Sequence, residues 1–332
     1  MSYADANRRY FDAISDSYDS KPWFAKTNNL VTDALRSDLA WIGVPLGAGE
    51  ASATPPPPPP PAAGTAEIRL LDYACGTGLM TRVFGPYVTR TTGIDISPNM
   101  VSTYNQRARD VGLAPDTVSA VVGNLFDKAD ASPASLSGPE FWNFDLATVG
   151  FGFHHFEDVV FAASQLRERL RPGGVLLISD FLEGGDVLAD EKGDMIEGSE
   201  GNHAVHDHHH HHHHHGHGHG HGHGHSHEQD SGSKKHDSAH DSSNEKHDVS
   251  DTSASFQRKM AASVVVPHFT KSGVQQFFTE AGFVDVDVIT MKEKCYMEFA
   301  GKKLWRTVLF ARGRKPLGNL DNSNNDNEKS EL

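Results

Sequence analysis

The sequence lacks the features of a secreted or membrane-spanning protein. Its 332 residues include only two cysteines, Cys75 and Cys295, which are too few for a disulfide framework and favour a reducing compartment. No apolar run is long enough to cross a bilayer, so no membrane span is expected. The N-terminal stretch has no apolar centre of the kind found in secretory signals. We therefore expect a cytoplasmic location, with the nucleus as the alternative.

An excess of positive charge is also absent. The formal net charge is −14, and most of it comes from two segments. Residues 186–255 contain 14 Asp and Glu against 4 Lys, and residues 316–332 contain 4 acids against one Lys. The rest of the chain is close to neutral and has no basic cluster. Because nucleic-acid binding depends on clustered lysine and arginine, no DNA or RNA partner is expected.

Three segments lack the alternation of apolar and polar residues that builds a core. Residues 51–66 contain seven consecutive prolines, which predict a stiff, extended linker. Residues 186–255 hold 19 of the 22 histidines, and their acidic, apolar-poor composition predicts a disordered His-rich insertion. Residues 316–332 are expected to form a disordered tail. The remaining residues suit one α/β domain with additions.

Outside these segments the chain alternates between strand and helix patterns. We expect residues 1–50 to form an N-terminal helical cap, and residues 67–185 and 256–315 to form the two parts of an α/β core. The element order predicts a Rossmann-like, doubly wound, mostly parallel sheet of seven strands with helices on both faces. The last two strands have no helix between them, so they should pair as an antiparallel hairpin at the sheet edge. The expected strands are residues 68–73, 90–95, 117–123, 144–150, 175–181, 283–289 and 304–312, and the expected helices are residues 78–86, 97–111, 157–171 and 272–282.

The turn after the first expected strand carries the main functional signal. Gly76 and Gly78 allow a tight turn and a close approach of the backbone to a ligand. A dinucleotide site would have a third glycine, which is missing, and it would not place Asp72 beside a pyrophosphate. Asp95, at the end of the second strand, can accept both hydroxyls of a ribose. These residues together favour a positively charged nucleoside without phosphate, and S-adenosylmethionine fits that description.

At this point the chain resembles the class I S-adenosylmethionine-dependent methyltransferases, and it does so over most of its patterned sequence. Two positions depart from the family pattern, because Ala74 replaces the first glycine of the turn and Asn124 stands where an aspartate is frequent. The matching motifs are DYACGTG (72–78), GIDIS (93–97), FDLATVGFGFHHF (144–156), LRPGGVLLISDF (170–181) and PHFTKSGVQQFFTEAGF (267–283). The resemblance implies S-adenosyl-L-methionine as cofactor, held by Asp72, Ala74, Gly76, Gly78, Asp95, Ile96, Met100, Asn124 and Leu125.

The N-terminal stretch resembles one branch of that family. YFDAISDSYDS (10–20) is similar to the start of methyltransferases of the ubiquinone/menaquinone type, in which a helix caps the cofactor. The resemblance implies that Tyr10, Phe11 and Tyr18 are lid residues, with Tyr18 in contact with the cofactor. Alternatively, these aromatic rings only pack the cap onto the sheet. Packing is the preferred interpretation for Phe11, and both interpretations stay open for Tyr18.

Three histidines are candidate bases. Methyl transfer is an in-line displacement, so the enzyme can act mainly by positioning the acceptor, and a base is needed only where the acceptor loses a proton. His154 and His155 directly follow the fourth strand, and His268 precedes the helix at 272–282. Imidazole titrates near neutral pH and therefore suits this task. The alternative is that these histidines only shape the pocket.

The near-neutral body, the aromatic residues after the fourth strand and the cap favour methyl transfer to a small-molecule acceptor. A protein or RNA methyltransferase is the first alternative. A non-catalytic, cofactor-binding regulatory protein is the second, and its His tract would bind metal. The run His208–His215 is chemically capable of weak Zn²⁺, Ni²⁺ or Cu²⁺ binding, but low-complexity expansion without a role is the preferred explanation. No preformed metal site is predicted.

Overall fold

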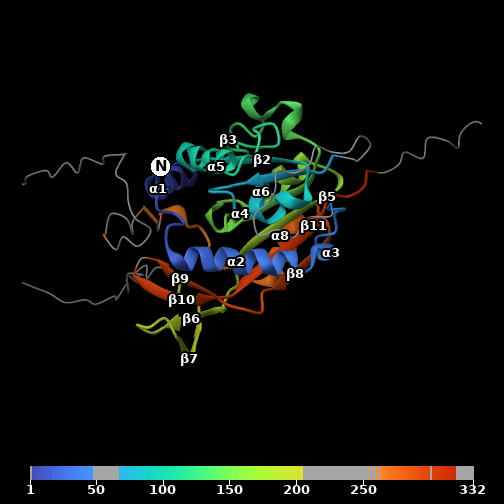
Figure 1. Ribbon diagram of the computed structural model, residues 1–332. Coiled ribbons are helices and arrows are strands. Elements are labelled where there is room, and N and C mark those ends of the chain that lie inside the picture. The colour runs from blue at the N-terminus through green and yellow to red at the C-terminus, as the bar shows by residue number, and fades with distance from the viewer. Residues whose placement is uncertain are drawn as a thin grey trace, which may run out of the picture.

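A computed structural model of the chain places two sheets, the helices around them and three N-terminal helices (Figure 1). The residues it describes are 2–47, 67–204, 253, 259–260, 262–299 and 301–318. The predicted linker at 51–66 lies outside these residues. So do most of the predicted His-rich insertion and most of the predicted tail.

The main sheet has seven strands in the order β3-β2-β1-β4-β5-β11-β8. The five strands from β3 to β5 are parallel, whereas β11 runs antiparallel to both of its neighbours, β5 and β8. This arrangement confirms the predicted mostly parallel, Rossmann-like sheet and the antiparallel pairing of the last two predicted strands. The bounds are Arg69–Tyr73 for β1, Arg90–Asp95 for β2, Val118–Val122 for β3, Phe144–Gly150 for β4, Leu170–Phe181 for β5, Val284–Thr290 for β8 and Val308–Arg314 for β11.

The helices begin where the local sequence predicts. In α5, Pro98 is the first residue, and the Ser97 hydroxyl accepts a hydrogen bond from the Met100 amide at 3.1 Å. Among the described residues, no helix is both long and apolar enough to cross a membrane. The helices are α1 (Tyr3–Ile14), α2 (Pro22–Arg36), α3 (Leu39–Ile42), α4 (Leu79–Phe84), α5 (Pro98–Asp110), α6 (Val159–Arg169) and α8 (Lys271–Glu280), with short 3-10 turns at Gly85–Tyr87, Ala134–Leu136, Pro139–Phe141 and Phe153–His155.

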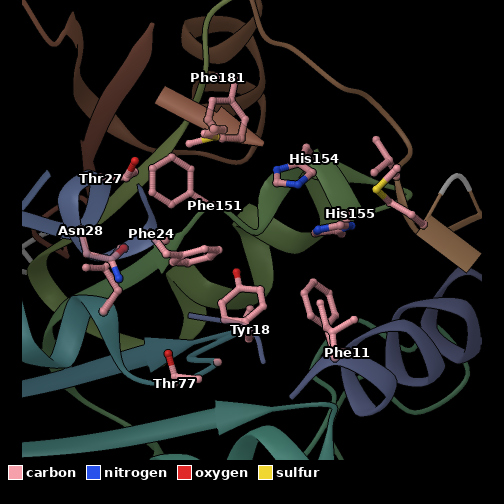
Figure 2. A pocket seen from close by; sticks show the side chains of 18 of the residues that line it. Phe11, Tyr18, Phe24, Thr27, Asn28, Thr77, Phe151, His154, His155 and Phe181 are labelled. Carbon is pink, nitrogen blue, oxygen red and sulfur yellow. The ribbon is translucent and has the colours of Figure 1, made fainter. Parts of the chain in front are cut away.

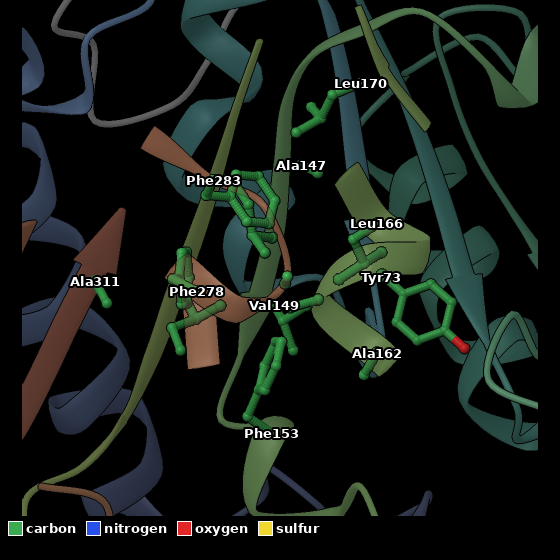
Figure 3. Packing of buried hydrophobic residues seen from close by; sticks show 14 of the residues in the cluster. Tyr73, Ala147, Val149, Phe153, Ala162, Leu166, Leu170, Phe278, Phe283 and Ala311 are labelled. Carbon is green, nitrogen blue, oxygen red and sulfur yellow. The ribbon is translucent and has the colours of Figure 1, made fainter. Parts of the chain in front are cut away.

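Alternate residues of the central strands pack against opposite layers. Leu70, in β1, faces a cluster that includes residues of α2 and α4. Its neighbour Leu71 faces the cluster formed with α6 and α8 (Figure 3). Leu176 and Leu177 divide in the same way along β5, because successive side chains of a strand point to opposite faces. The sheet is therefore covered on both sides, as the near-continuous apolar strands predict.

A second sheet of four strands corrects the predicted domain boundaries. Its order is β7-β6-β10-β9, and every pairing in it is antiparallel. Residues 186–204 fall within the predicted disordered insertion, but they contain β6 (Asp186–Ala189) and β7 (Met195–Gly201). The predicted strand at 304–312 is two strands in different sheets, β10 (Lys302–Arg306) and β11. The sequence does not predict the strand at β9 (Cys295–Phe299).

The sequence does not predict these strands because they gain their stability from distant partners. Most residues of β7 are exposed, so its sequence carries no apolar alternation. It pairs with β6, which in turn pairs with β10, more than a hundred residues further along the chain. Strand formation of this kind depends on neighbours and burial more than on local preference.

Replacement of a residue in the core between β5 and the α2–α4 layer should destabilise the fold. Leu177 is completely buried, so we expect Leu177→Ala to lower the free energy of unfolding by about 2–5 kcal/mol. Val122→Ala is the control, because Val122 lies on an edge strand with 48% of its surface exposed, and it should change stability by less than about 0.5 kcal/mol. Urea unfolding of both variants measures the difference, and equal effects would contradict the assigned core.

Candidate active site

A cavity of about 190 Å³ lies at the carboxyl ends of β1, β4 and β5 (Figure 2). Its walls come from four parts of the chain that are far apart in sequence. They are the cap, the glycine turn after β1, the segments that end β4 and β5, and residues of the second sheet with the segment before α8. In open α/β sheets this edge is the usual place for a ligand.

The glycine turn forms one wall with its backbone in the left-handed region. Gly76 has φ 50° and Gly78 has φ 92°, and a Cβ atom at Gly78 would meet the Tyr104 ring at 3.1 Å. A Cβ atom at Gly76 would meet no atom within 4 Å, so the space beside it is open. Ala74, which replaces the usual glycine, also has a positive φ of 52°. Such a turn lets a ligand approach the backbone closely.

Two buried carboxylates brace this turn from beneath. The Asp72 carboxylate accepts hydrogen bonds from the Thr81 amide at 2.9 Å and the Thr81 hydroxyl at 2.7 Å. Asp95 accepts from the Gly76 amide at 2.8 Å and from the Ser97 amide at 2.9 Å. Asp72 therefore holds the start of α4 and Asp95 holds the turn itself, although neither residue is part of the cavity wall. Their predicted contact with a cofactor stays a prediction.

Burial makes both carboxylates difficult to ionise. It raises the pKa of Asp72 to about 7, although the hydrogen bonds from Thr81 act in the opposite direction. It also raises the pKa of Asp95 to about 6, against the hydrogen bonds from Ser97 and Gly76. A positive charge close by would favour the ionised forms. A cationic ligand therefore fits this turn, whereas a phosphate would meet two buried acids.

The remaining predicted cofactor residues occupy several positions around the turn. Tyr18, Ala74 and Gly76 line the cavity. The Asn124 side chain accepts a hydrogen bond from the Phe126 amide at 2.9 Å, which shapes the loop after β3. The predicted residues outside the cavity wall are Asp72, Gly78, Asp95, Ile96, Met100, Asn124 and Leu125. Of these, Leu125 is fully buried in the core.

The N-terminal cap is fastened to the glycine turn and to α5. Asp19 accepts a hydrogen bond from the Thr77 hydroxyl at 3.0 Å and also pairs with the guanidinium of Arg107. Arg107 and Thr77 together hold the pKa of Asp19 below its usual value, against the effect of burial. The Asp12 carboxylate accepts from the Ser97 hydroxyl at 2.6 Å. These contacts fix the cap to the glycine turn and to the start of α5.

The aromatic residues of the cap both pack and face the cavity. Ile14 and Met100 form a small buried cluster, and Tyr10, Phe11 and Tyr18 pack against it. The same three aromatic residues also line the cavity. Packing and ligand contact are therefore compatible for these residues, and cofactor contact by Tyr18 stays a prediction.

His154 and Asp180 form a hydrogen-bonded pair at the cavity. The Nδ1 atom of His154 lies 3.0 Å from a carboxylate oxygen of Asp180, and the His154 amide donates to the same carboxylate at 3.1 Å. Asp180 is completely buried at the end of β5, whereas His154 lines the cavity. Because a carboxylate only accepts, Nδ1 carries the proton and Nε2 is left to act as a base. This is the geometry of a general base with an orienting acid.

Asp180 is a residue that sequence reasoning did not single out. The signal was an acid in the last part of the strand LLISDF, next to the strand whose end carries His154. Parallel neighbouring strands end at the same edge of a sheet, so the two side chains meet. The order of strands in the sheet was needed to use this signal.

His155 has a different environment from its neighbour. Its Nδ1 donates to the Ser263 carbonyl oxygen at 2.7 Å, and its ring packs against Phe11 at 5.0 Å. Burial, together with the nearby His154, lowers the pKa of His155 well below its usual value. His155 is therefore a neutral wall residue that ties the 3-10 turn after β4 to the segment before α8.

His268 lies outside the cavity wall, in a buried charge network. Its Nε2 donates to Asp186 at 2.6 Å, and Arg306 donates to the other oxygen of the same carboxylate at 2.9 Å. These partners outweigh burial and lower the pKa of Asp186 to about 2. His268 thus holds the second sheet to the core, and Arg306, which sequence reasoning missed, is the member that reaches the cavity.

Metal binding by the histidine tract stays a prediction. The run His208–His215 lies outside the described residues. Within the described part of the chain, no group of three or more His, Cys, Asp or Glu side chains is arranged to hold a metal ion.

Comparisons with known proteins find similarity to methyltransferases. A family model for a methyltransferase domain matches residues 51–230. An uncharacterised methyltransferase of Schizosaccharomyces pombe is 33% identical over 119 residues, which are 36% of this chain and 40% of that protein. A ubiquinone/menaquinone biosynthesis C-methyltransferase of Psychromonas ingrahamii is 33% identical over 116 residues, which are 34% of this chain and 42% of that protein. The matched stretch is thus less than half of either relative.

The chain also aligns with solved structures. The crystal structure of the YcgJ protein from Bacillus subtilis aligns with a TM-score of 0.42 at 15% identity, and the alignment covers 76% of this chain and 94% of that one. A phosphoethanolamine N-methyltransferase from Haemonchus contortus, solved with S-adenosyl-L-methionine, aligns with a TM-score of 0.40 at 14% identity. That alignment covers 76% of this chain and 50% of the other.

The raised pKa of Asp72 predicts a pH-dependent cost of keeping this acid buried. In the unfolded chain Asp72 ionises near the ordinary aspartate pKa of 3.8, but in the folded protein it ionises only near 7. The folded protein therefore loses stability as pH rises from about 4 to about 7. We expect Asp72→Asn, which keeps an oxygen for Thr81, to raise the free energy of unfolding by about 1–4 kcal/mol at about pH 7.5. This gain should shrink as pH falls toward about 4.

Denaturant unfolding at several pH values measures this effect. The control is Asp116→Asn, because Asp116 is exposed and its replacement should change stability little at any pH. A gain for Asp72→Asn that stays the same at all pH values, or a loss at high pH, would contradict the assignment.

Proposed function

The chain belongs to the methyltransferase domain family, whose model matches more than half of it, and we propose that it transfers a methyl group from S-adenosylmethionine to a small, largely apolar acceptor. One observation carries this proposal. A single cavity has the glycine turn in one part of its wall and the His154–Asp180 pair in another. A methyl donor and a base would therefore face the same acceptor.

The residues around the turn fit the cofactor. S-adenosylmethionine supplies, when bound, a methyl group on a positively charged sulfur that is ready for in-line displacement. The space beside Gly76 is open, Ala74 lines the same cavity, and the buried acids Asp72 and Asp95 favour a positive charge nearby. Tyr18 and the cap exclude water from this side of the cavity.

His154 is the proposed general base. Its Nδ1 is held by Asp180, so Nε2 would be the atom that takes the proton lost by the acceptor. Asp180 keeps the ring in one tautomer and stabilises the imidazolium that forms. His155 is not suited to this step, because burial disfavours its charged form.

The cavity walls favour a small acceptor over a protein or an RNA. Phe151 and Phe181 stack with their ring centroids 5.0 Å apart, and both belong to the wall. Phe151 has a positive φ of 53°, which is rare for a bulky residue and is found where the surrounding structure imposes it. Aromatic walls beside the cap suit an apolar molecule of limited size.

Two measurements test the proposed function. Isothermal titration should show binding of S-adenosylmethionine, and absence of binding at millimolar cofactor would overturn the proposal. Transfer of a tritiated methyl group to a cell extract, separated into protein, RNA and metabolites, should label the metabolite fraction. Label in the protein or RNA fraction would overturn the small-molecule acceptor.

The base is tested by His154→Gln. We expect the rate of methyl transfer to the labelled fraction to fall by about 10²–10⁴-fold, because this range is typical for loss of a general base. Affinity for S-adenosylmethionine should be nearly unchanged. Asp180→Asn should reduce the rate as well, since the ring loses its orienting acid.

His155→Gln is the matched control, because its partner is the Ser263 carbonyl and its ring is neutral. Its rate should stay within about tenfold of the parent, since it loses no proton-transfer group. Equal losses for the two histidine variants would argue against His154 as the base.

A further inference from the structure

The second sheet forms the part of the cavity wall that lies farthest from the family's glycine turn in the sequence. Met297 and Glu298 of β9 belong to this wall, together with Arg306 of β10. Helix α2 packs beside β9, and the Thr27 hydroxyl donates to the Tyr296 carbonyl oxygen at 3.2 Å (Figure 1). This end of the cavity is therefore built between α2 and β9.

One acid in the wall, Glu298, forms no ion pair among the described residues. Arg306 is paired with Asp186 at 2.9 Å, and His154 is paired with Asp180. Glu298 accepts a hydrogen bond from the Tyr296 hydroxyl. Lys303 lies opposite Glu298 in the pairing of β9 with β10, but its ammonium group donates to the Glu191 carbonyl oxygen at 2.8 Å. An uncompensated carboxylate that faces a largely apolar cavity will attract a cation.

Aromatic rings surround the same end. Trp23 and Phe24 are the first aromatic residues of α2, with ring centroids 4.7 Å apart, and Phe24 also contacts Tyr18 at 4.8 Å. All three residues line the cavity, as does the amide side chain of Asn28, one turn further along α2. The faces of aromatic rings attract organic cations, most strongly where water is excluded.

We propose that the end of the cavity between α2 and β9 is a recognition subsite for an organic cation, a protonated amine or quaternary ammonium group carried by the acceptor. Glu298 supplies the opposite charge, and Trp23 and Phe24 supply the aromatic faces. This inference rests on the proposed function, because it assigns the acceptor's half of the same cavity.

The position of the subsite limits the shape of the acceptor. Figure 2 shows Phe24, Thr27 and Asn28 on one side of the cavity and His154 and His155 on the opposite side. The cationic group and the atom that is methylated therefore lie at different ends of the acceptor. The acceptor has an apolar body between them, which contacts the Phe151–Phe181 stack.

A pair of probes of equal shape tests the subsite. Choline and its neutral carbon analogue 3,3-dimethyl-1-butanol differ at this end only in charge, so their dissociation constants for the full-length protein can be compared by isothermal titration. We expect choline to bind at least about tenfold more tightly, and Glu298→Gln to reduce this preference to about one. The affinity for S-adenosylmethionine should stay within about threefold of the parent value, because the subsite lies apart from the glycine turn.

Glu293→Gln is the matched control, because Glu293 is an exposed acid two residues before β9 and its replacement removes the same charge. This variant should keep the preference for choline. Equal binding of the two probes to the parent protein, or a preference that survives in Glu298→Gln, overturns the subsite. A parallel loss of S-adenosylmethionine affinity in Glu298→Gln also overturns it, because the carboxylate would then serve the cofactor.

Failure of the subsite and failure of the proposed function give different results. The probe titrations need neither cofactor nor turnover, so they report on the subsite alone. A protein that binds S-adenosylmethionine but does not distinguish the probes keeps its proposed function and loses the cation subsite.

Discussion

Burial of acidic side chains at the ends of strands is the constraint on which the site depends. Asp72 lies near the end of β1, Asp95 ends β2, Asp180 lies near the end of β5, and Asp186 begins β6. Each is buried, and hydrogen-bond or ion-pair partners compensate the cost of its burial. Asp72 holds Thr81 in α4, Asp95 holds the Gly76 amide of the turn, and both keep raised pKa values. Asp180 holds a histidine, and Asp186 holds both an arginine and a histidine. A buried carboxylate is costly unless it is paired or protonated, so each of these acids requires a hydrogen-bond donor, a cation or a bound proton beside it.

The glycine turn alone would form only one wall of the cavity. The N-terminal cap and the second sheet supply the other walls. The cap closes it from the N-terminal side through Asp12 and Asp19. The second sheet closes it from the other side and is held by the network around Asp186, which also accepts hydrogen bonds from the His203 and Ala204 amides. The wall at the glycine turn is thus made from residues close together in sequence, and the opposite wall from residues far apart.

Local signals explain which elements could be predicted from the sequence. Ser97 and Pro98 define the start of α5 through a side-chain cap and a preset φ, and both effects act within a few residues. Strand β2 has the bounds that the sequence predicts, because its residues are almost all buried. The strands in residues 186–201 and the division of 304–312 at Thr307 escape sequence-based prediction, because their partners lie about a hundred residues away. Where pairing with a distant strand stabilises a strand, the local amino-acid composition does not predict that strand.

The amino-acid sequence by itself determined the class of fold and the place of the glycine turn, because glycines and strand periodicity act locally. Tertiary structure decided which histidine is placed to act as a base and what faces it. His154, His155 and His268 look alike in the sequence, but one is held by Asp180 at the cavity, one is a neutral wall residue and one belongs to a buried charge network. The role of an imidazole depends on its hydrogen-bond partner and its burial, and the packing of distant segments sets both.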